Sequence, residues 1–383
     1  MTHLLIATDN YPPRWDGISR FLTEVLPRID DFHITVICPD YGEYEVADAK
    51  HIKLSTTDMT FGDYHFANPN LSCIKDQVRQ ADIVFGQSIG TIGSVAGHYA
   101  RKTNTPLIHY THTIEWQLVP KATEHNLLKR LSQTCTRRYA QWYYNRCDKL
   151  ITPSRNISET LHYEGIQTKT AIAPLGVDHD VFKPREDHEE TRLIASIRRK
   201  YLDDADHTLI GYHGRLAREK DLMTLLRAVK RLRKQRDDFS VLIIGDGLDD
   251  IRTKFEQDPA CHTLPAQENI EAYVAAFDIF VTPTLTETTS LSTAEAMACG
   301  NAVIATPAGY IEDYINHGEN GLLFDKQDNY MLSEYLRDLL DDKDKRIRLG
   351  RDANLTAKEI FQWNTTATRI QDILKDHLSE DEP

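Results

Sequence analysis

Short apolar runs alternate with longer amphipathic segments along this chain, and this alternation limits its possible folds more than any other feature. In the first half, the runs with the composition of strands are His3–Thr8, His33–Cys38, Asp82–Phe85, Pro106–Tyr110 and Lys149–Thr152. Segments between them, such as Ser19–Ile29 and Ser94–Thr103, have the apolar spacing of helices. Continuous apolar strands separated by helices are typical of a parallel sheet that is covered on both faces. The first half therefore predicts a doubly wound α/β domain.

The same alternation restarts after Pro184. A charged segment, Arg185–Asp206, precedes the helical pattern Asp221–Arg236 and a second series of apolar runs. These predicted strands are Thr208–Tyr212, Ser240–Ile244, Ile279–Thr282 and Ala302–Ala305. A chain of 383 residues is long enough for two domains. We predict a first α/β domain over residues 1–184, a second over 185–360 and a terminal helix over 361–383.

Composition excludes several classes of protein. The formal net charge of −13 argues against a nucleic-acid partner, because phosphate contacts need a basic surface. No apolar segment approaches the roughly 18–20 residues that span a bilayer, and Met1–Ala7 lacks the features of a signal peptide. We therefore expect a cytoplasmic protein. The six cysteines are scattered without C-x-x-C spacing and Asp204-Ala205-Asp206 lies in a charged connector, so we expect no metal site.

Two loops of the second domain carry the strongest candidate residues. Arg215 and Lys220 follow a predicted strand, and two cations five residues apart on one loop can hold adjacent phosphates. Glu287 stands on a polar loop, and Glu295 stands inside the alanine-rich helix that follows it, whose N-terminus can bind an anion. Carboxylates at this separation suit the hydroxyls of a sugar and a ribose. The alternatives are surface charges on an ordinary loop, with Glu287 capping the helix and Glu295 solvated.

Two loops of the first domain also follow predicted strands. The irregular loop Asp9–Ile18 leads directly into a helix, at the sheet edge where α/β proteins bind ligands. His109-Tyr110-Thr111-His112-Thr113 ends another strand. A histidine there is either catalytic or structural, and the pattern alone leaves both interpretations open.

Together these motifs resemble the retaining glycosyltransferases of family 4. The most specific part is the E-x7-E pattern Glu287 to Glu295, followed by Ala296-Met297-Ala298 and Gly300. Gly214-Arg215-Leu216 with Lys220, and Ala173–Asp178 with Phe182, fit the same family. The resemblance implies the GT-B architecture: two facing Rossmann-like domains, each with a doubly wound parallel sheet, and a C-terminal helix that crosses back to the first domain.

The resemblance also implies roles for individual residues. The donor would be a UDP- or GDP-linked sugar, with Arg215 and Lys220 on its diphosphate, Glu295 on the ribose and Glu287 on the transferred hexose. Backbone N–H groups would contact the distal phosphate, and they belong to Gly17, Thr289, Ser290 and Leu291. His112 would stabilise the developing charge at the reacting centre. Transfer to an acceptor hydroxyl would proceed with retention, by front-side attack and without a metal or cofactor. Two positions depart from the family pattern: Asp16-Gly17 replaces a Gly-Gly pair and Thr288-Thr289 replaces Phe-Gly.

The acceptor is suggested by the segment Lys121–Lys149. It has seven Lys and Arg residues against two acidic ones, interleaved with Tyr139, Trp142, Tyr143 and Tyr144. Such a pattern suits an anionic membrane surface, so we favour a membrane glycolipid or lipid-linked glycan and a peripheral location at the inner face of the cell membrane. The alternative interpretation is that the aromatic rings lie in the core and the cations are solvated.

Tyr11 and Trp116 are candidate acceptor contacts, although Trp116 can equally be a core residue. Other functions that stay open are transfer to a soluble sugar, a GT-B nucleotide-sugar epimerase and a nucleotide-sugar binder without turnover.

Overall fold

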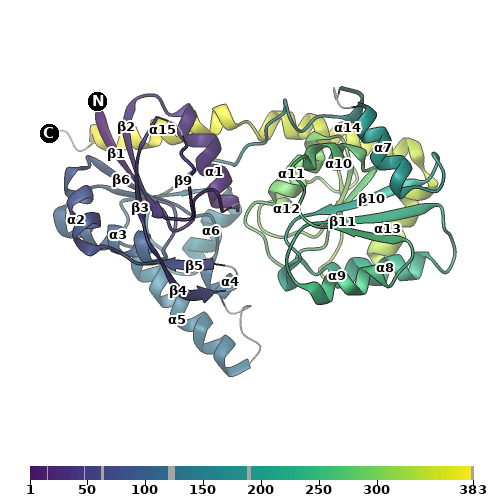
Figure 1. Ribbon diagram of the computed structural model, residues 1–383, viewed down its shortest axis with the longest axis horizontal. Coiled ribbons are helices and arrows are strands. Elements are labelled where there is room, and N and C mark those ends of the chain that lie inside the picture. Colours follow the sequence, from purple (N-terminus) through teal and green to yellow (C-terminus); the bar gives the residue numbers. More distant parts are fainter. Residues whose placement is uncertain (15, 47, 62–63, 120–125, 188–190, 381–383) are drawn as a thin grey trace. The chain divides into compact units, whose positions relative to one another are not determined.

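The computed structural model describes residues 1–383 except 15, 47, 62–63, 120–125, 188–190 and 381–383. The chain divides into two compact units (Figure 1). The first unit contains Met1–Leu175 together with Trp363–Pro383, and the second contains Gly176–Gln362. Each unit is built around its own parallel sheet.

The first unit has a seven-stranded sheet in the order β3-β2-β1-β6-β7-β8-β9. Its strands are β1 (Thr2–Ala7), β2 (Phe32–Pro39), β3 (Lys50–Leu54), β6 (Ile83–Gly86), β7 (Leu107–Tyr110), β8 (Lys149–Thr152) and β9 (Thr170–Ile172). Its helices are α1 (Gly17–Val25), η1 (Leu26–Arg28), α2 (Leu71–Gln80), α3 (Thr91–Thr103), α4 (Glu115–Leu118), α5 (Asn126–Tyr144), α6 (Arg155–Tyr163) and α15 (Trp363–Glu380). A separate antiparallel hairpin pairs β4 (Thr56–Phe61) with β5 (Tyr64–Ala67).

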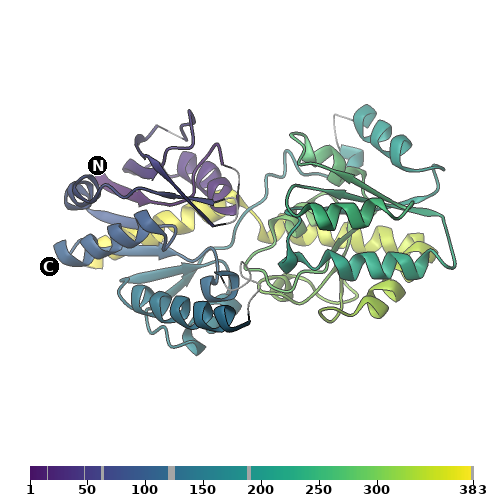
Figure 2. The same cartoon turned by 60° about the horizontal axis from the view of Figure 1, so that its bottom comes forward.

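The second unit has a six-stranded sheet in the order β12-β11-β10-β13-β14-β15. Its strands are β10 (Thr208–His213), β11 (Phe239–Ile244), β12 (Cys261–Leu264), β13 (Ile279–Thr282), β14 (Ala302–Ala305) and β15 (Leu322–Leu323). Its helices are η3 (Arg185–Asp187), α7 (Thr191–Tyr201), η4 (Arg218–Lys220), α8 (Leu222–Leu232), α9 (Asp249–Glu256), α10 (Ile270–Ala276), α11 (Leu291–Ala298), α12 (Ile311–Tyr314), α13 (Asn329–Asp341) and α14 (Lys343–Ile360). Figure 2 shows helices on both sides of this sheet.

The apolar runs of the sequence form the central strands, as predicted. Leu4, Leu5 and Ile6 of β1 are all fully buried, which is the burial pattern of a strand with helices on both faces. In the second unit the equivalent strand β10 is buried along its whole length. The doubly wound α/β class is therefore confirmed, whereas the outer strands β3, β9, β12 and β15 lack a long apolar run and were not predicted.

Strand order reverses once in each sheet. The first sheet turns back between β1 and β6, and the second between β10 and β13. Because parallel strands end at the same edge, the loops that follow these two strands lie together at a topological switch point, where open α/β sheets bind ligands. The loop with Gly17 follows β1, the loop with Arg215 follows β10 and the loop with Glu287 follows β13.

The unit boundaries differ from the predicted ones. We expected the first domain to end at residue 184, but the division falls after Leu175. Val177 forms a bridge with Gln362, and Phe182 is buried in the core of the second unit, so residues from 176 onward pack with that unit. At the other end Phe361 also belongs to that core, which moves the second boundary from 360 to 362.

The terminal helix α15 belongs to the first unit, as the GT-B resemblance implies. Arg28 Nε donates to Asn364 Oδ1 at 3.0 Å, and Lys375 pairs with Asp31. The ring of Trp363 lies 6.4 Å from that of Phe21. Within the described residues, none of the helices is both long enough and apolar enough to cross a membrane.

Candidate active site

The two candidate loops of the second unit are neighbours at the switch point. Strands β10 and β13 pair directly, with Ile210 opposite Ile279. The loops beyond them are tied by two hydrogen bonds to the carbonyl of Glu219: from Leu285 N at 2.8 Å and from Thr284 Oγ1 at 3.1 Å. These bonds hold the loop after β13 against η4, which carries Lys220.

The predicted diphosphate cations are both paired with carboxylates. Lys220 Nζ donates to Glu287 Oε2, and Arg215 Nη2 donates to Glu219 Oε1 at 2.6 Å. Glu219 was not predicted as a site residue. An anion that binds here must replace Glu219 and Glu287 as the partners of the two cations, and Glu287 is then released to accept hydrogen bonds from another group.

A glycine supports the loop that carries Glu287. Gly309 has a φ of +60°, and a Cβ at this position would stand 1.8 Å from the backbone oxygen of Glu287. Next to it, Tyr310 N donates to the carbonyl of Thr288 at 3.1 Å. Only glycine combines this backbone conformation with so close an approach. The segment before α12 therefore fixes the position of Glu287.

The N-terminus of α11 lies at the end of the same loop. Ser290 is the N-cap residue, but its side chain makes no capping hydrogen bond, because its hydroxyl interacts with Thr293 Oγ1 at 2.7 Å. The Oγ1 atom of Thr289 is buried without a hydrogen-bond partner in the described part of the chain. The first amides of a helix need acceptors, and an anion can supply them. This arrangement suits the predicted phosphate contacts of Thr289, Ser290 and Leu291.

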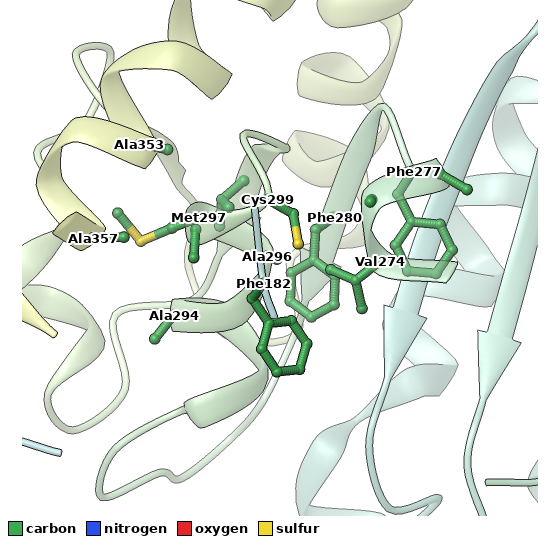
Figure 3. Close-up of a cluster of buried hydrophobic side chains, with 14 of the residues drawn as sticks. Phe182, Val274, Phe277, Phe280, Ala294, Ala296, Met297, Cys299, Ala353 and Ala357 are labelled. Atoms are coloured by element: carbon green, nitrogen blue, oxygen red, sulfur yellow. The ribbon is translucent and has the colours of Figure 1, made fainter. Parts of the chain in front are cut away.

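Helix α11 is held by tight packing (Figure 3). Ala294, Ala296 and Met297 are fully buried in one cluster with Phe280 and Phe182. The small side chains let α11 pack closely against α14, which contributes Ala353 and Ala357 to the same cluster. The position of the helix N-terminus is therefore set by the core of the unit.

Glu295 points into the unit and is only 1% exposed. Its Oε2 atom lies 3.1 Å from His213 Nε2, at hydrogen-bond distance but without hydrogen-bond direction. The interpretation of Glu295 as a solvated side chain is therefore wrong. Burial also sets a condition on the predicted ribose contact: the ribose must reach a carboxylate that has almost no exposed surface.

In the first unit, the N-terminus of α3 is equivalent to that of α11, and a carboxylate of the protein itself occupies it. The carboxylate of Asp9, which is 1% exposed, accepts hydrogen bonds from Ile92 N at 2.7 Å and Gly93 N at 3.1 Å. It also accepts from Ser88 Oγ at 2.6 Å and Thr91 Oγ1 at 3.0 Å. Asp9 therefore fills the anion position at the N-terminus of α3, the helix that follows β6.

Gly17 is the exposed first residue of α1. No atom lies within 4 Å of the position that a Cβ would take, so there is open space in front of it. Asp16, which stands where the family usually has glycine, is the N-cap of α1, and its Oδ1 accepts from Ile18 N at 3.0 Å and Ser19 N at 2.9 Å. The open space suits the predicted approach of a phosphate to Gly17, while the next two amides are already used.

His112 follows β7 at the same edge of the first sheet. Its Nε2 lies 2.9 Å from Gln87 Oε1, and its ring packs against Phe21 and Tyr110 with centroid distances of 4.8 Å and 4.4 Å. Burial, and then the neighbouring His109, hold the pKa of His112 well below its usual range. Its imidazole is therefore neutral at physiological pH, with Nε2–H donating to Gln87, a residue that was not predicted.

Two predicted acceptor contacts are wrong. Tyr11 is fully buried, and its hydroxyl bonds to His51 Nε2 at 2.5 Å and accepts from Val46 N at 3.2 Å. Trp116 is 2% exposed and lies in the core. Both aromatic rings belong to the hydrophobic interior and present no surface to an acceptor.

In the basic, aromatic segment 121–149, some described residues agree with the core interpretation and others with the membrane-surface interpretation. Lys121 lies outside the described residues. On α5, Tyr143 and Tyr144 are buried, as the core interpretation predicts, whereas Tyr139 and Trp142 are 37% and 44% exposed. One face of this helix therefore packs on the sheet and another faces solvent.

Comparisons with known proteins agree with the architecture. A family model described as Glycosyltransferase Family 4 matches residues 15–181, and one described as Glycosyl transferases group 1 matches residues 194–356. The two matches follow one another and together take in most of both units.

Two proteins with similar sequences are described as a transferase and a synthase. The chain is 29% identical over 299 residues to the sulfoquinovosyl transferase SQD2 of Arabidopsis thaliana, covering 76% of this chain and 56% of that protein. It is 24% identical to the alpha-monoglucosyldiacylglycerol synthase of Streptococcus pneumoniae, covering 83% of this chain and 74% of that protein. The chain thus spans little more than half the length of the plant relative.

A solved structure, Alr3699/HepE of Anabaena in complex with UDP and glucose, superposes with a TM-score of 0.78 at 17% identity, covering 98% of this chain and 100% of that one. This likeness supports the GT-B fold. With both halves matched by adjoining family models and both sheets doubly wound, the chain belongs to the family 4 glycosyltransferases, whose second half is a group 1 glycosyl transferase domain.

Proposed function

We propose that this protein is a retaining glycosyltransferase that moves a hexose from a UDP- or GDP-linked donor to a hydroxyl of a membrane glycolipid or lipid-linked glycan. The observation that carries the proposal is the group at the switch point of the second sheet. There, Lys220 pairs with Glu287 and Arg215 pairs with Glu219, and the loop that carries Glu287 leads into the N-terminus of α11, which has no side-chain cap. Cations, a hydroxyl-binding carboxylate and the amides of a helix N-terminus are the groups that a sugar diphosphate requires.

On this proposal, donor binding exchanges the ion-pair partners of Lys220 and Arg215. The diphosphate takes the place of Glu287 beside Lys220 and of Glu219 beside Arg215, and its distal phosphate accepts from the amides of Thr289, Ser290 and Leu291. Glu287 is then free to bind the hydroxyls of the hexose, and Glu295 binds those of the ribose. We keep the prediction that the backbone N–H of Gly17 contacts the distal phosphate.

The departing nucleoside diphosphate gains negative charge in the transition state. Fixed cations and helix amides stabilise that charge electrostatically, so we propose that no metal or other cofactor is needed. His112 is neutral, and with Nε2–H directed to Gln87 its Nδ1 carries a lone pair that can stabilise positive charge at the anomeric carbon. The leaving phosphate accepts the proton of the acceptor hydroxyl on the same face of the sugar, and the configuration is retained.

A lipid acceptor is supported by two observations. One relative is described as an alpha-monoglucosyldiacylglycerol synthase. On α5, the apolar side chains of Leu128, Leu131 and Trp142 are about half exposed beside exposed arginines. We propose that segment 121–149 faces an anionic membrane and that the protein is peripheral at the inner face of the cell membrane.

The first test of the donor is a thermal-shift panel of UDP-, GDP- and ADP-sugars, with and without magnesium. A ligand that binds only the folded state raises the melting temperature. We expect one nucleotide class to give a metal-independent shift that is lost in Glu295→Ala and kept in Glu319→Ala, an exposed carboxylate outside the site. If no nucleotide sugar shifts the wild type, the transferase proposal fails and a non-catalytic binder or an epimerase with another ligand remains.

The role of His112 has a separate test. His112→Ala should lower turnover much more than donor affinity, because the imidazole acts on charge that develops only in the transition state. Equal losses in the two quantities would assign His112 to binding instead.

A further inference from the structure

A cavity of about 160 Å³ lies between α3 and α5 of the first unit, and a second of about 140 Å³ adjoins it. Both are lined by Arg101, Leu107 and Arg146. Leu107 begins β7, and Asp148, which lines the second cavity, directly precedes β8. This pair of cavities, the α3–α5 pocket, is therefore at the amino ends of the strands, at the edge opposite the loops with Gly17 and His112. It belongs to neither the donor site nor the catalytic loop.

The α3–α5 pocket is basic in an acidic protein. Arg101, Lys102 and Arg146 line it with exposed side chains, and no ion pair with a carboxylate engages any of the three within the described ranges. The acidic side chain at the pocket, Asp148, accepts a hydrogen bond from Leu107 N at 2.7 Å. Three cations against one carboxylate create a local positive charge in a chain with a formal net charge of −13.

The shape of the pocket is fixed by packing. A Cβ at Gly97 would stand 2.6 Å from the ring of Tyr143, so the absence of a side chain lets this ring rest on α3 and form a wall of the pocket. The hydroxyl of Tyr143 donates to Gly93 O at 3.1 Å, which holds the ring in place. The guanidinium of Arg146 lies 4.2 Å over the ring of Trp142 and donates to its carbonyl at 2.8 Å.

An exposed apolar stripe runs from the pocket along α5. Trp142 lines the pocket, and Leu131 and Leu128 follow on the same helical face, 59% and 50% exposed. The 19 residues of α5 span about 28 Å. The helix begins on the side of α4 and the His112 loop and ends beside the α3–α5 pocket.

We propose that the α3–α5 pocket binds the phosphate of an anionic phospholipid headgroup, while Leu128, Leu131 and Trp142 enter the acyl boundary. Guanidinium and ammonium groups suit a phosphate diester, and an apolar stripe beside them suits the chains of the same lipid rather than a free anion. The choice of a membrane as the source of the phosphate rests on the proposed lipid acceptor. The pocket would then anchor one end of α5, and the acceptor would enter near the other end.

The test uses the full-length protein and vesicles of phosphatidylcholine with or without phosphatidylglycerol, at low salt. Removing two headgroup cations in Arg101→Gln/Lys102→Gln should weaken binding to phosphatidylglycerol vesicles roughly 30-fold, because each cation near an anionic surface contributes about fivefold. The charge-matched control Lys230→Gln/Lys234→Gln, which removes two exposed cations of the second unit, should change it less than about twofold. Equal losses in both variants would show non-specific attraction and overturn the proposal.

Trp142 provides a direct reporter. Of the four tryptophans, Trp15 lies outside the described residues, Trp116 and Trp363 are buried, and Trp142 is 44% exposed. In a Trp15→Phe background, a blue shift of tryptophan emission on vesicles should therefore disappear in Trp142→Phe. A shift that persists in this variant would place the contact elsewhere and contradict the proposal.

A free phosphate is the other source of the same chemistry. If inorganic phosphate at millimolar concentration stabilises the wild type but not Arg101→Gln/Lys102→Gln, and vesicle binding is unaffected by the variant, the pocket serves a soluble phosphate and the lipid assignment is wrong. Nucleotide-sugar binding measured on the same variant should stay unchanged. Failure of the transferase proposal would abolish nucleotide-sugar binding in the wild type without affecting vesicle binding, so the two failures are distinguishable.

Discussion

The N-termini of α3 and α11 occupy equivalent places in the two units, each following the strand beyond the switch point, but they are satisfied differently. In the first unit Asp9 reaches across from the loop after β1, and its buried carboxylate accepts four hydrogen bonds at the start of α3. In the second unit the N-cap side chain of α11 makes no such bond, and two cation–carboxylate pairs lie at the neighbouring loop. The comparison shows that one acidic residue can satisfy the helix terminus at the switch point of a doubly wound sheet, and we propose that the terminus without such a residue binds a ligand.

The largest expected effect is on the open site. In Lys220→Met, the diphosphate loses a cation and Glu287 loses its partner, so we expect turnover to fall about 10²- to 10³-fold, as for other single electrostatic groups at a reacting centre. The measurement is steady-state transfer at saturating acceptor. Lys234→Met, at an exposed position beyond α8, is the matched control, and similar losses in both variants would remove Lys220 from the site.

Removing the carboxylate from the closed site should reduce stability instead. Asp9→Ala leaves two buried amides and two hydroxyls without their acceptor, which should lower the free energy of unfolding by about 3 kcal/mol or more, since hydrogen bonds to charged groups contribute 1.5–3 kcal/mol each. Urea unfolding measures this loss, with the exposed Asp76→Ala as control. An unchanged midpoint in Asp9→Ala would break the comparison, because Asp9 would not be needed at α3.

Glu115 is a second acidic residue of the first unit, and its partners differ from the helix amides that Asp9 accepts from. Glu115 lies near the His112 loop, where it accepts from Tyr144 Oη at 2.7 Å and Thr113 Oγ1 at 3.2 Å. Burial raises the pKa of Glu115 from 4.5 to about 7. The folded state therefore binds the proton more tightly than the unfolded state, and the stability that this proton provides is complete below pH 4.5 and lost as pH rises through 7.

Glu115→Gln should isolate this effect. Between pH 5 and pH 8, we expect the unfolding free energy of Glu115→Gln to gain up to about 3 kcal/mol relative to the wild type, because one pKa unit corresponds to about 1.4 kcal/mol. Paired urea titrations at several pH values provide the measurement. A difference between the two proteins that does not vary with pH would show that Glu115 is ionised in the folded state.

The smallest expected effect concerns Glu219. Because Arg215 is half exposed, its pair with Glu219 contributes little, and Glu219→Gln should raise the affinity for a nucleoside diphosphate only about two- to fivefold by removing a competing charge. Calorimetric titration would detect it. Weaker binding in Glu219→Gln would mean that Glu219 orients Arg215 instead of competing with the ligand.

The sequence predicted the parts of this account that depend on local pattern. The central strands followed from apolar runs. Glu287, Arg215 and Lys220 were predicted as site residues because they follow strands within family motifs, and the structure places them on neighbouring loops. The pairing of Arg215 with Glu219 was also readable, since cation and acid are four residues apart. What could not be read is the partner of Asp9, because Ile92 is 83 positions away and nothing near Asp9 indicates it.

The two wrong predictions of acceptor contacts have the same cause. An aromatic residue in a loop near a strand end can line a cleft or fill the core, and only tertiary packing decides. Tyr11 is drawn inward by a hydrogen bond to His51, forty positions along the chain, and Trp116 joins the cluster of the first unit. The basic pocket between α3 and α5 was missed for a similar reason, because Arg101 and Arg146 are separate in sequence and meet only in the fold.

The most direct test of the central claim is to close the open site in the way that Asp9 closes the other. Calorimetric titration of UDP and GDP should be made on the wild type, on Ser290→Asp and on the control Ser196→Asp at an exposed position of α7. A carboxylate at the N-cap should satisfy the amides of α11 and repel the diphosphate. We predict that the melting temperature of Ser290→Asp is kept or raised while nucleotide affinity falls about 100-fold, since like charges in contact cost several kcal/mol. Unchanged affinity in a folded Ser290→Asp would contradict the assignment of the phosphate site to α11.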